Sequence, residues 1–99
     1  MIKYVSEESF KDELVNKKVL VDFYATWCGP CKMLGLVIEK LDEDELIPIL
    51  NVDTDESSSL AAEYNIFSIP TLIMFENGKE LKRNVGYLSY EDLKKWVSE

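Results

Sequence analysis

Two cysteines separated by two residues are the strongest candidates for chemistry in this sequence. Cys28 and Cys31 enclose Gly29-Pro30, and they follow an apolar run from Val19 to Tyr24 that predicts a buried strand. Apolar residues then recur at helical spacing and predict the buried stripe of a helix, formed by Met33, Leu34, Val37, Ile38 and Leu41. The pair therefore lies where a strand ends and a helix begins. A helix N-terminus offers unpaired N–H groups and the positive end of the peptide dipole, and both stabilise a thiolate, the reactive form of cysteine.

Four interpretations compete for this cysteine pair. A structural zinc needs about four ligands, and a chain with two cysteines and no histidine supplies them only if carboxylates or a second subunit complete the set. A structural disulfide over so short a loop contributes only ~2 kcal/mol. Two small buried hydrophobic residues are a third interpretation, but Gly29-Pro30 suits a packed helix poorly. The fourth, a reversible dithiol, accounts best for the spacing, because such neighbours close and reopen a disulfide with little backbone movement.

Composition and charge limit the classes of partner and the cellular compartment that we expect for the protein. The 99 residues are enough for one domain, which we place over residues 1–99. A net charge of -8 disfavours nucleic acid and anionic membranes as partners. The first eight residues lack the apolar core of a signal peptide, and no stretch has the length of a membrane span, so we expect a cytoplasmic protein. Without histidine, Cys-His and Ser-His catalysis are excluded, and no metal or cofactor is expected.

The chain predicts alternating strands and helices that end in a hairpin and a last helix. Asn77-Gly78 is the strongest hairpin signal, because both residues tolerate the positive φ of a tight turn. Strands separated by helices are expected to run parallel, with the hairpin adding an antiparallel edge to one mixed five-stranded sheet covered on both faces by helices. We expect strands at 2–5, 19–24, 47–52, 71–75 and 79–85, and helices at 6–16, from the cysteines to about 42, at 59–64 and after Ser89.

Several stretches together resemble the thioredoxin family. The run Trp27-Cys28-Gly29-Pro30-Cys31-Lys32 is followed downstream by Ile69-Pro70-Thr71, by Asn77-Gly78-Lys79 and by Val85-Gly86, in the family order and over the whole chain. The resemblance implies the thioredoxin fold, which agrees with the order of strands and helices above. It also implies a protein-disulfide reductase acting through a reversible Cys28-Cys31 pair.

The resemblance assigns a role to each half of the dithiol. Cys28, as a thiolate, would attack a substrate disulfide, and Cys31 would resolve the mixed disulfide. Asp22 matches the family's acid/base for Cys31, and burial of its carboxylate predicts a raised pKa; the alternative is a carboxylate that reaches solvent at the end of its strand.

The resemblance also implies a substrate surface and partners. Pro70 matches a cis-proline, which would leave the Ile69 backbone free to pair with an extended substrate. The expected substrate-binding residues are Trp27, Gly29, Pro30, Ile69, Pro70, Val85 and Gly86; for Trp27 the alternative is plain core packing. The expected partners are disulfide-containing proteins and a thioredoxin reductase as electron donor, with the chain acting as a monomer. Two rivals remain open: a binding module on the same scaffold, and a reductant charged from glutathione or ferredoxin.

Three positions depart from the family pattern. Leu36 stands where the second helix usually has a proline, and it follows Gly35, so the helix kink is expected to be weaker or glycine-based. Ile49 stands where many bacterial relatives have a buried lysine near the aspartate, which predicts a further rise in the pKa of Asp22. Ser68 replaces a frequent glycine before Ile69. These departures leave the sulfur chemistry untouched and bear on the choice of reductase and substrates.

Overall fold

The sheet and helices form in the predicted order. A computed structural model describes residues 2–99, so Met1, the first residue of the predicted domain, lies outside the described residues. The elements are β1 (Ile2–Tyr4), α1 (Glu7–Glu13), β2 (Lys18–Tyr24), α2 (Gly29–Glu43), β3 (Ile49–Asp53), α3 (Ser58–Glu63), β4 (Thr71–Glu76), β5 (Lys79–Val85) and α4 (Tyr90–Ser98).

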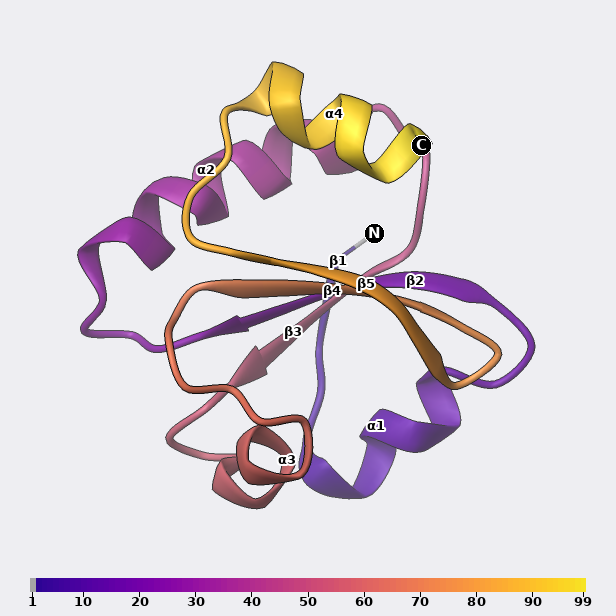
Figure 1. Cartoon of the computed structure of the whole chain (residues 1–99), viewed down its shortest axis with the longest axis vertical. Coiled ribbons are helices and arrows are strands. Elements are labelled where there is room, and N and C mark those ends of the chain that lie inside the picture. The colour runs from indigo at the N-terminus through magenta and orange to yellow at the C-terminus, as the bar shows by residue number, and fades with distance from the viewer. Residues whose placement is uncertain (1) are drawn as a thin grey trace.

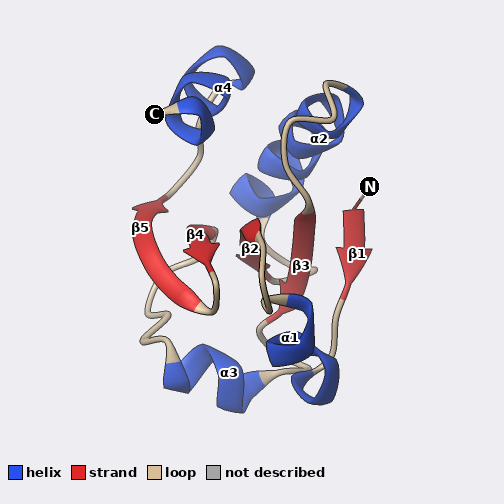
Figure 2. Ribbon diagram, turned by 90° about the vertical axis from the view of Figure 1, so that its right-hand side faces the viewer, coloured by secondary structure: helices blue, strands red, loops and turns tan. Residues whose placement is uncertain are grey.

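One five-stranded sheet divides the molecule into two helical layers. Its strand order is β1-β3-β2-β4-β5, with β2 at the centre. Helices α2 and α4 cover one face, and α1 and α3 cover the other (Figures 1 and 2). Because β2 is covered on both sides, both of its faces are buried, as its apolar run predicts.

The direction of β4 corrects one expectation. The β1–β3 and β2–β3 pairs are parallel, but β4 runs antiparallel to β2 although α3 lies between β3 and β4. The six residues of α3 span only about 9 Å, whereas the five residues of β3 span about 16 Å. Helix α3 is therefore too short to carry the chain back along the sheet, and β4 starts at the end where β2 finishes, with Thr71 opposite Phe23.

Each face of the sheet has its own hydrophobic core. Under α1 and α3, Phe10 and Leu60 pack with side chains of the central strands. Under α2 and α4, Leu34 and Leu93 pack against the opposite sides of the same strands. The central strands thus hold the start of α2 in a fixed position, and this start contains the cysteines.

Local sequence signals place the starts of two helices and the hairpin turn where they are expected. Ser6 and Ser89 are N-caps that accept backbone N–H groups of α1 and α4. Asn77 and Gly78 have φ of 51° and 82°, which the hairpin turn requires. Helix α1 ends at Glu13, earlier than expected, and the chain turns through Asn16 with a φ of 59°.

Helix α2 differs from its predicted buried stripe at one position. Met33 was expected to face the core, but its side chain is 57% exposed. Leu34, Ile38 and Leu41 already fill the contact with the sheet, and Met33 lies about 100° around the helix from Leu34, outside that contact. At the expected kink, α2 is one uninterrupted helix through Gly35 and Leu36, and Leu36 faces solvent.

Candidate functional site

The cysteine pair lies at the junction of β2 and α2. The chain leaves the sheet at Tyr24, and α2 begins at Gly29 with Pro30 in its first turn, where a missing N–H costs nothing. Cys28 is the N-cap of α2, and Cys28 and Cys31 form a disulfide with a Cα–Cα distance of 5.2 Å. This Cα–Cα distance lies within the range that a disulfide spans, as a reversible dithiol requires.

The helix start supplies a hydrogen-bond donor to the first sulfur. The backbone N–H of Cys31 donates to Sγ of Cys28 over 3.2 Å, in the position where a serine or aspartate cap would accept. The same contact and the helix dipole favour negative charge on Cys28 once the disulfide is reduced.

Both cysteine residues are buried, with Cys28 6% exposed and Cys31 4% exposed. The cause is a small cluster in which Ala25, Tyr24 and Ile69 pack around the pair. Access to Cys28 therefore requires a substrate that fits against these neighbours.

Asp22 is buried beneath the pair on β2. Its residue is 2% exposed, so the predicted burial is confirmed and the solvent-reaching alternative is wrong. Oδ1 of Asp22 has no hydrogen-bond partner among residues 2–99. Desolvation raises the pKa of Asp22 from 3.8 to about 7, because burial penalises the carboxylate. A carboxyl with this pKa exchanges its proton at neutral pH.

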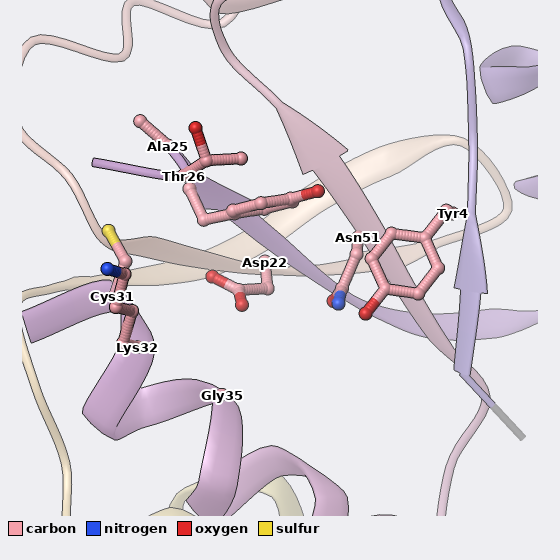
Figure 3. Close-up of a pocket in the computed structure, with 9 residues that line it drawn as sticks. Tyr4, Asp22, Ala25, Thr26, Cys31, Lys32, Gly35 and Asn51 are labelled. Atoms are coloured by element: carbon pink, nitrogen blue, oxygen red, sulfur yellow. The ribbon is translucent and has the colours of Figure 1, made fainter. Parts of the chain in front are cut away.

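A cavity of about 260 Å³ connects Asp22 to Cys31. Asp22 and Asn51 come from the sheet, Cys31 and Gly35 come from α2, and all four line the cavity. Figure 3 shows the Asp22 carboxyl between Cys31 on one side and Asn51 on the other. The buried carboxyl and the second sulfur therefore face the same cavity, through which a proton can pass.

The loop before β4 faces the first sulfur. The Ile69-Pro70 peptide bond is cis, as the resemblance implies. Sγ of Cys28 lies 3.9 Å from the carbonyl oxygen of Ile69. Within residues 2–99, neither backbone group of Ile69 makes a backbone–backbone hydrogen bond, whereas the Pro70 carbonyl accepts from the Gly86 N–H over 2.8 Å. The backbone of Ile69 is thus free to pair with another chain, next to the sulfur.

Exposed apolar side chains surround this loop. Trp27 is 70% exposed, so the alternative of plain core packing is wrong. Its indole N–H donates to Oδ2 of Asp55 over 2.8 Å. Val85 is 59% exposed, and Gly86, with a φ of 102°, follows it at the end of β5.

The structure gathers all the predicted site residues around the start of α2 and the cis-proline loop, and it adds residues that sequence reasoning missed. Asp55 fixes the indole of Trp27 although it is 28 positions away, and Asn51 lies beside Asp22. Phe67, in the same loop as Ile69, is 90% exposed. The one sequence signal for Asn51 was its place as the single polar side chain in the predicted strand 47–52, whereas its register with Asp22 became visible only in the structure.

The described residues also bear on two other kinds of site, a membrane span and a metal centre. No helix within residues 2–99 has the length and hydrophobicity needed to cross a membrane. In the same part of the chain, no group of three or more histidine, cysteine or acidic side chains is placed to hold a metal ion.

Comparison with known proteins places the chain in a family. The family model described as Thioredoxin matches residues 1–99. A thioredoxin of Chlamydia trachomatis is 46% identical over 99 residues, covering 99% of this chain and 97% of that protein. A thioredoxin of Mycoplasmoides gallisepticum is 41% identical over 96 residues, covering 94% and 96%. The crystal structure of a Malassezia sympodialis thioredoxin has a TM-score of 0.89 at 35% identity, covering 99% of this chain and 89% of that one. With its cysteine pair joined at the start of α2, this chain belongs to the thioredoxin family of thiol-disulfide oxidoreductases.

Proposed function

We propose that the protein is a general protein-disulfide reductase that works as an electron carrier. The observation that carries the proposal is the disulfide between Cys28 and Cys31 at the N-terminus of α2, with Sγ of Cys28 3.9 Å from the Ile69 carbonyl, which makes no backbone–backbone hydrogen bond within residues 2–99. It combines an activated sulfur with a backbone edge that an extended substrate can join.

In the first step, the reduced protein attacks a disulfide of the substrate. The Cys28 thiolate forms a bond to one substrate sulfur, the substrate S–S bond breaks, and the other sulfur leaves as a thiolate that takes up a proton. The Cys31 N–H and the start of α2 stabilise the Cys28 thiolate before the attack.

In the second step, Cys31 releases the substrate. Asp22 takes the Cys31 proton through the cavity that both residues line, and the Cys31 thiolate attacks Sγ of Cys28. The bond between Cys28 and the substrate sulfur breaks, that sulfur leaves as a thiolate that takes up a proton, and the Cys28–Cys31 disulfide remains. Two electrons have then passed to the substrate, and a thioredoxin reductase returns them to the protein.

The substrate is held as an added strand on the cis-proline loop. Its backbone pairs with Ile69, and its side chains contact an apolar surface next to Cys28. The proposed contact residues are Trp27, Gly29, Pro30, Ile69, Pro70, Val85 and Gly86. Since most of these contacts involve backbone or broad apolar surface, many different proteins fit, as a general reductase requires.

Charge and composition support the remaining features of the proposal. A net charge of -8 favours partners with basic docking surfaces and opposes nucleic acid or anionic membranes. We place the protein in the cytoplasm, where thiols stay reduced, and we expect it to act as a monomer, as one domain over residues 1–99.

Reduction of insulin by dithiothreitol, followed by turbidity, tests the proposal. Wild-type protein should accelerate the precipitation of the insulin B chain, and Cys28→Ser should not. Cys31→Ser should instead trap a stable mixed disulfide, which a non-reducing gel detects. If Cys28→Ser is as active as wild type, the proposal fails. If a physiological function persists with both cysteines replaced by serine, the chain is a binding module instead.

A further inference from the structure

A row of polar side chains crosses three neighbouring strands on the α2 side of the sheet. Asp22 on β2 is the register partner of Asn51 on β3, and Asn51 is the register partner of Tyr4 on β1. Register partners on neighbouring strands point to the same face of a sheet. Figure 3 shows the three side chains in this order, with Cys31 on the far side of Asp22.

The two inner members of this row are buried and each has an unsatisfied oxygen. Asp22 is 2% exposed and Asn51 is 9% exposed. Within the described part of the chain, neither Oδ1 of Asp22 nor Oδ1 of Asn51 has a hydrogen-bond partner. Both residues line the cavity of about 260 Å³ that reaches Cys31. Buried polar oxygens without partners are uncommon, and two that share one cavity point to a common donor.

No hydrogen bond joins Asp22 to Asn51 within the described residues, but a neutral Asp22 carries a proton that can serve this pair of oxygens. A protonated carboxyl has one O–H to donate, and the amide oxygen of Asn51 is an acceptor on the neighbouring strand. The cavity has room for a water molecule to join the two groups where they do not meet directly.

We propose that Asn51 is a positioning residue that holds the Asp22 carboxyl in both of its protonation states during proton exchange with Cys31. This inference rests on the proposed function, because it gives Asp22 the role of proton acceptor. When Asp22 is neutral, its O–H donates to the amide oxygen of Asn51. When Asp22 is charged, the amide turns and its NH₂ group donates to the carboxylate.

Asn51 is the buried amide among the groups around Asp22. The titratable groups that share the cavity are Cys31 and Lys32 on α2, Tyr24 on β2 and Tyr4 on β1. Tyr24 is half-buried, and burial, followed by nearby charges that include Asp22, raises the pKa of its hydroxyl. Lys32 is exposed, and Tyr4 is 74% exposed at the edge strand, so both lie toward solvent. On the other side of Asp22, its register partner on β4 is the fully buried and apolar Leu72, which offers no hydrogen bond.

The experiment measures the titration of Asp22 in the full-length oxidised protein by NMR of its side-chain carboxyl carbon. Asn51→Leu keeps the size of the side chain and removes both hydrogen-bonding groups. Loss of the Asn51 hydrogen bond destabilises the carboxylate of Asp22 more than its neutral carboxyl. The pKa of Asp22 should therefore rise by about one pH unit, a tenfold change in the ratio of acid to carboxylate. The matched control is Leu72→Val, which alters packing on the other side of Asp22 and should leave the pKa of Asp22 unchanged.

A second variant keeps the test decisive if Asn51→Leu folds poorly. Asn51→Asp places a second carboxyl beside the first, so the two should titrate as a coupled pair, with one apparent pKa above and one below that of wild-type Asp22. Independent titration of the two carboxyls would overturn the inference. An unchanged pKa of Asp22 in Asn51→Leu, or an equal shift of this pKa in Leu72→Val, would overturn the inference as well.

A kinetic measurement separates this inference from the function on which it rests. In single-turnover release of a mixed disulfide, the pH midpoint of Cys31 attack should move in Asn51→Leu by the same amount as the pKa of Asp22. If the Asp22 titration moves and the midpoint does not, Asn51 is not a positioning residue for the reaction, although insulin reduction through Cys28 persists. Loss of insulin reduction by wild type would instead refute the proposed function.

Discussion

Replacing Asp22 by asparagine removes one buried charge and keeps the shape of the side chain. Burial raises the pKa of Asp22 from 3.8 to about 7. Between these two values the folded protein keeps a proton that the unfolded chain has already released. The folded state binds more protons, so stability falls as pH rises through this window.

The size of the effect follows from the same two pKa values. Each pH unit inside the window costs about 1.4 kcal/mol, and the cost levels off near the pKa of the folded state. Between pH 5 and pH 8 the wild type should therefore lose about 2.5 kcal/mol through Asp22 alone. Asp22→Asn has no titrating group here, so it should become more stable than wild type by a margin that grows by this amount.

Urea unfolding of both oxidised proteins at pH 5, 6, 7 and 8 measures the margin. Surface carboxyls whose pKa is lowered, such as Glu80 beside Arg83, change stability with pH in both proteins, so they cancel in the difference. Tryptophan fluorescence follows the transition. A margin that stays constant from pH 5 to pH 8 would refute the argument that Asp22 is buried and ionises near neutrality.

Three further predictions concern the surface, the core and the hairpin. Asp55→Ala removes the hydrogen-bond partner of the Trp27 indole N–H. Because one hydrogen bond contributes about 1 kcal/mol, the KM for a disulfide-containing protein should rise about two- to fivefold, while the pKa of the thiol stays unchanged. Steady-state insulin kinetics and a thiol titration measure the two quantities, and an unchanged KM would contradict the prediction. Phe10→Ala empties a fully buried site between α1 and the sheet and should cost about 3–5 kcal/mol in urea unfolding, whereas a loss below about 1 kcal/mol would contradict the core described here. Gly78→Ala places a side chain at a φ of 82° and should cost about 1 kcal/mol or more, and unchanged stability would contradict the turn geometry.

Local features were predictable because the residues that determine them are neighbours in the sequence. Ser6 and Ser89 cap helices whose first turns follow directly, and the Asn77-Gly78 turn depends on the φ of its own two residues. The burial of Asp22 was also accessible, since a single charge in an apolar strand has no other place to go once both faces are covered.

Features that depend on distant contacts were not predictable in the same way. The direction of β4 depends on how little of the sheet α3 spans, and helical periodicity does not report that span. The Trp27–Asp55 hydrogen bond and the Asp22–Asn51 register each join different elements. Met33 was misplaced because periodicity marks an apolar stripe without showing how much of it the sheet covers.

The cis bond before Pro70 and the roles of the two cysteines came from the family resemblance. Spacing alone left four interpretations of the cysteine pair open, and sequence alone favours a trans bond before any proline. The structure supplies the missing geometry, in which the Cys28–Cys31 disulfide meets the Ile69 carbonyl across the cis-proline loop.

The ionisation of Cys28 in the reduced protein shows directly whether the start of α2 makes this sulfur reactive. Thiolate absorbance in the ultraviolet is followed against pH in Cys31→Ser, where Cys28 is the remaining thiol, with the urea-unfolded variant as the control. We expect the pKa of Cys28 to lie at least one pH unit below the ~8.5 of a free thiol in the folded protein, and at that ordinary value once α2 is unfolded. A folded Cys28 that ionises at or above the ordinary value would contradict the claim that the start of α2 makes this sulfur reactive.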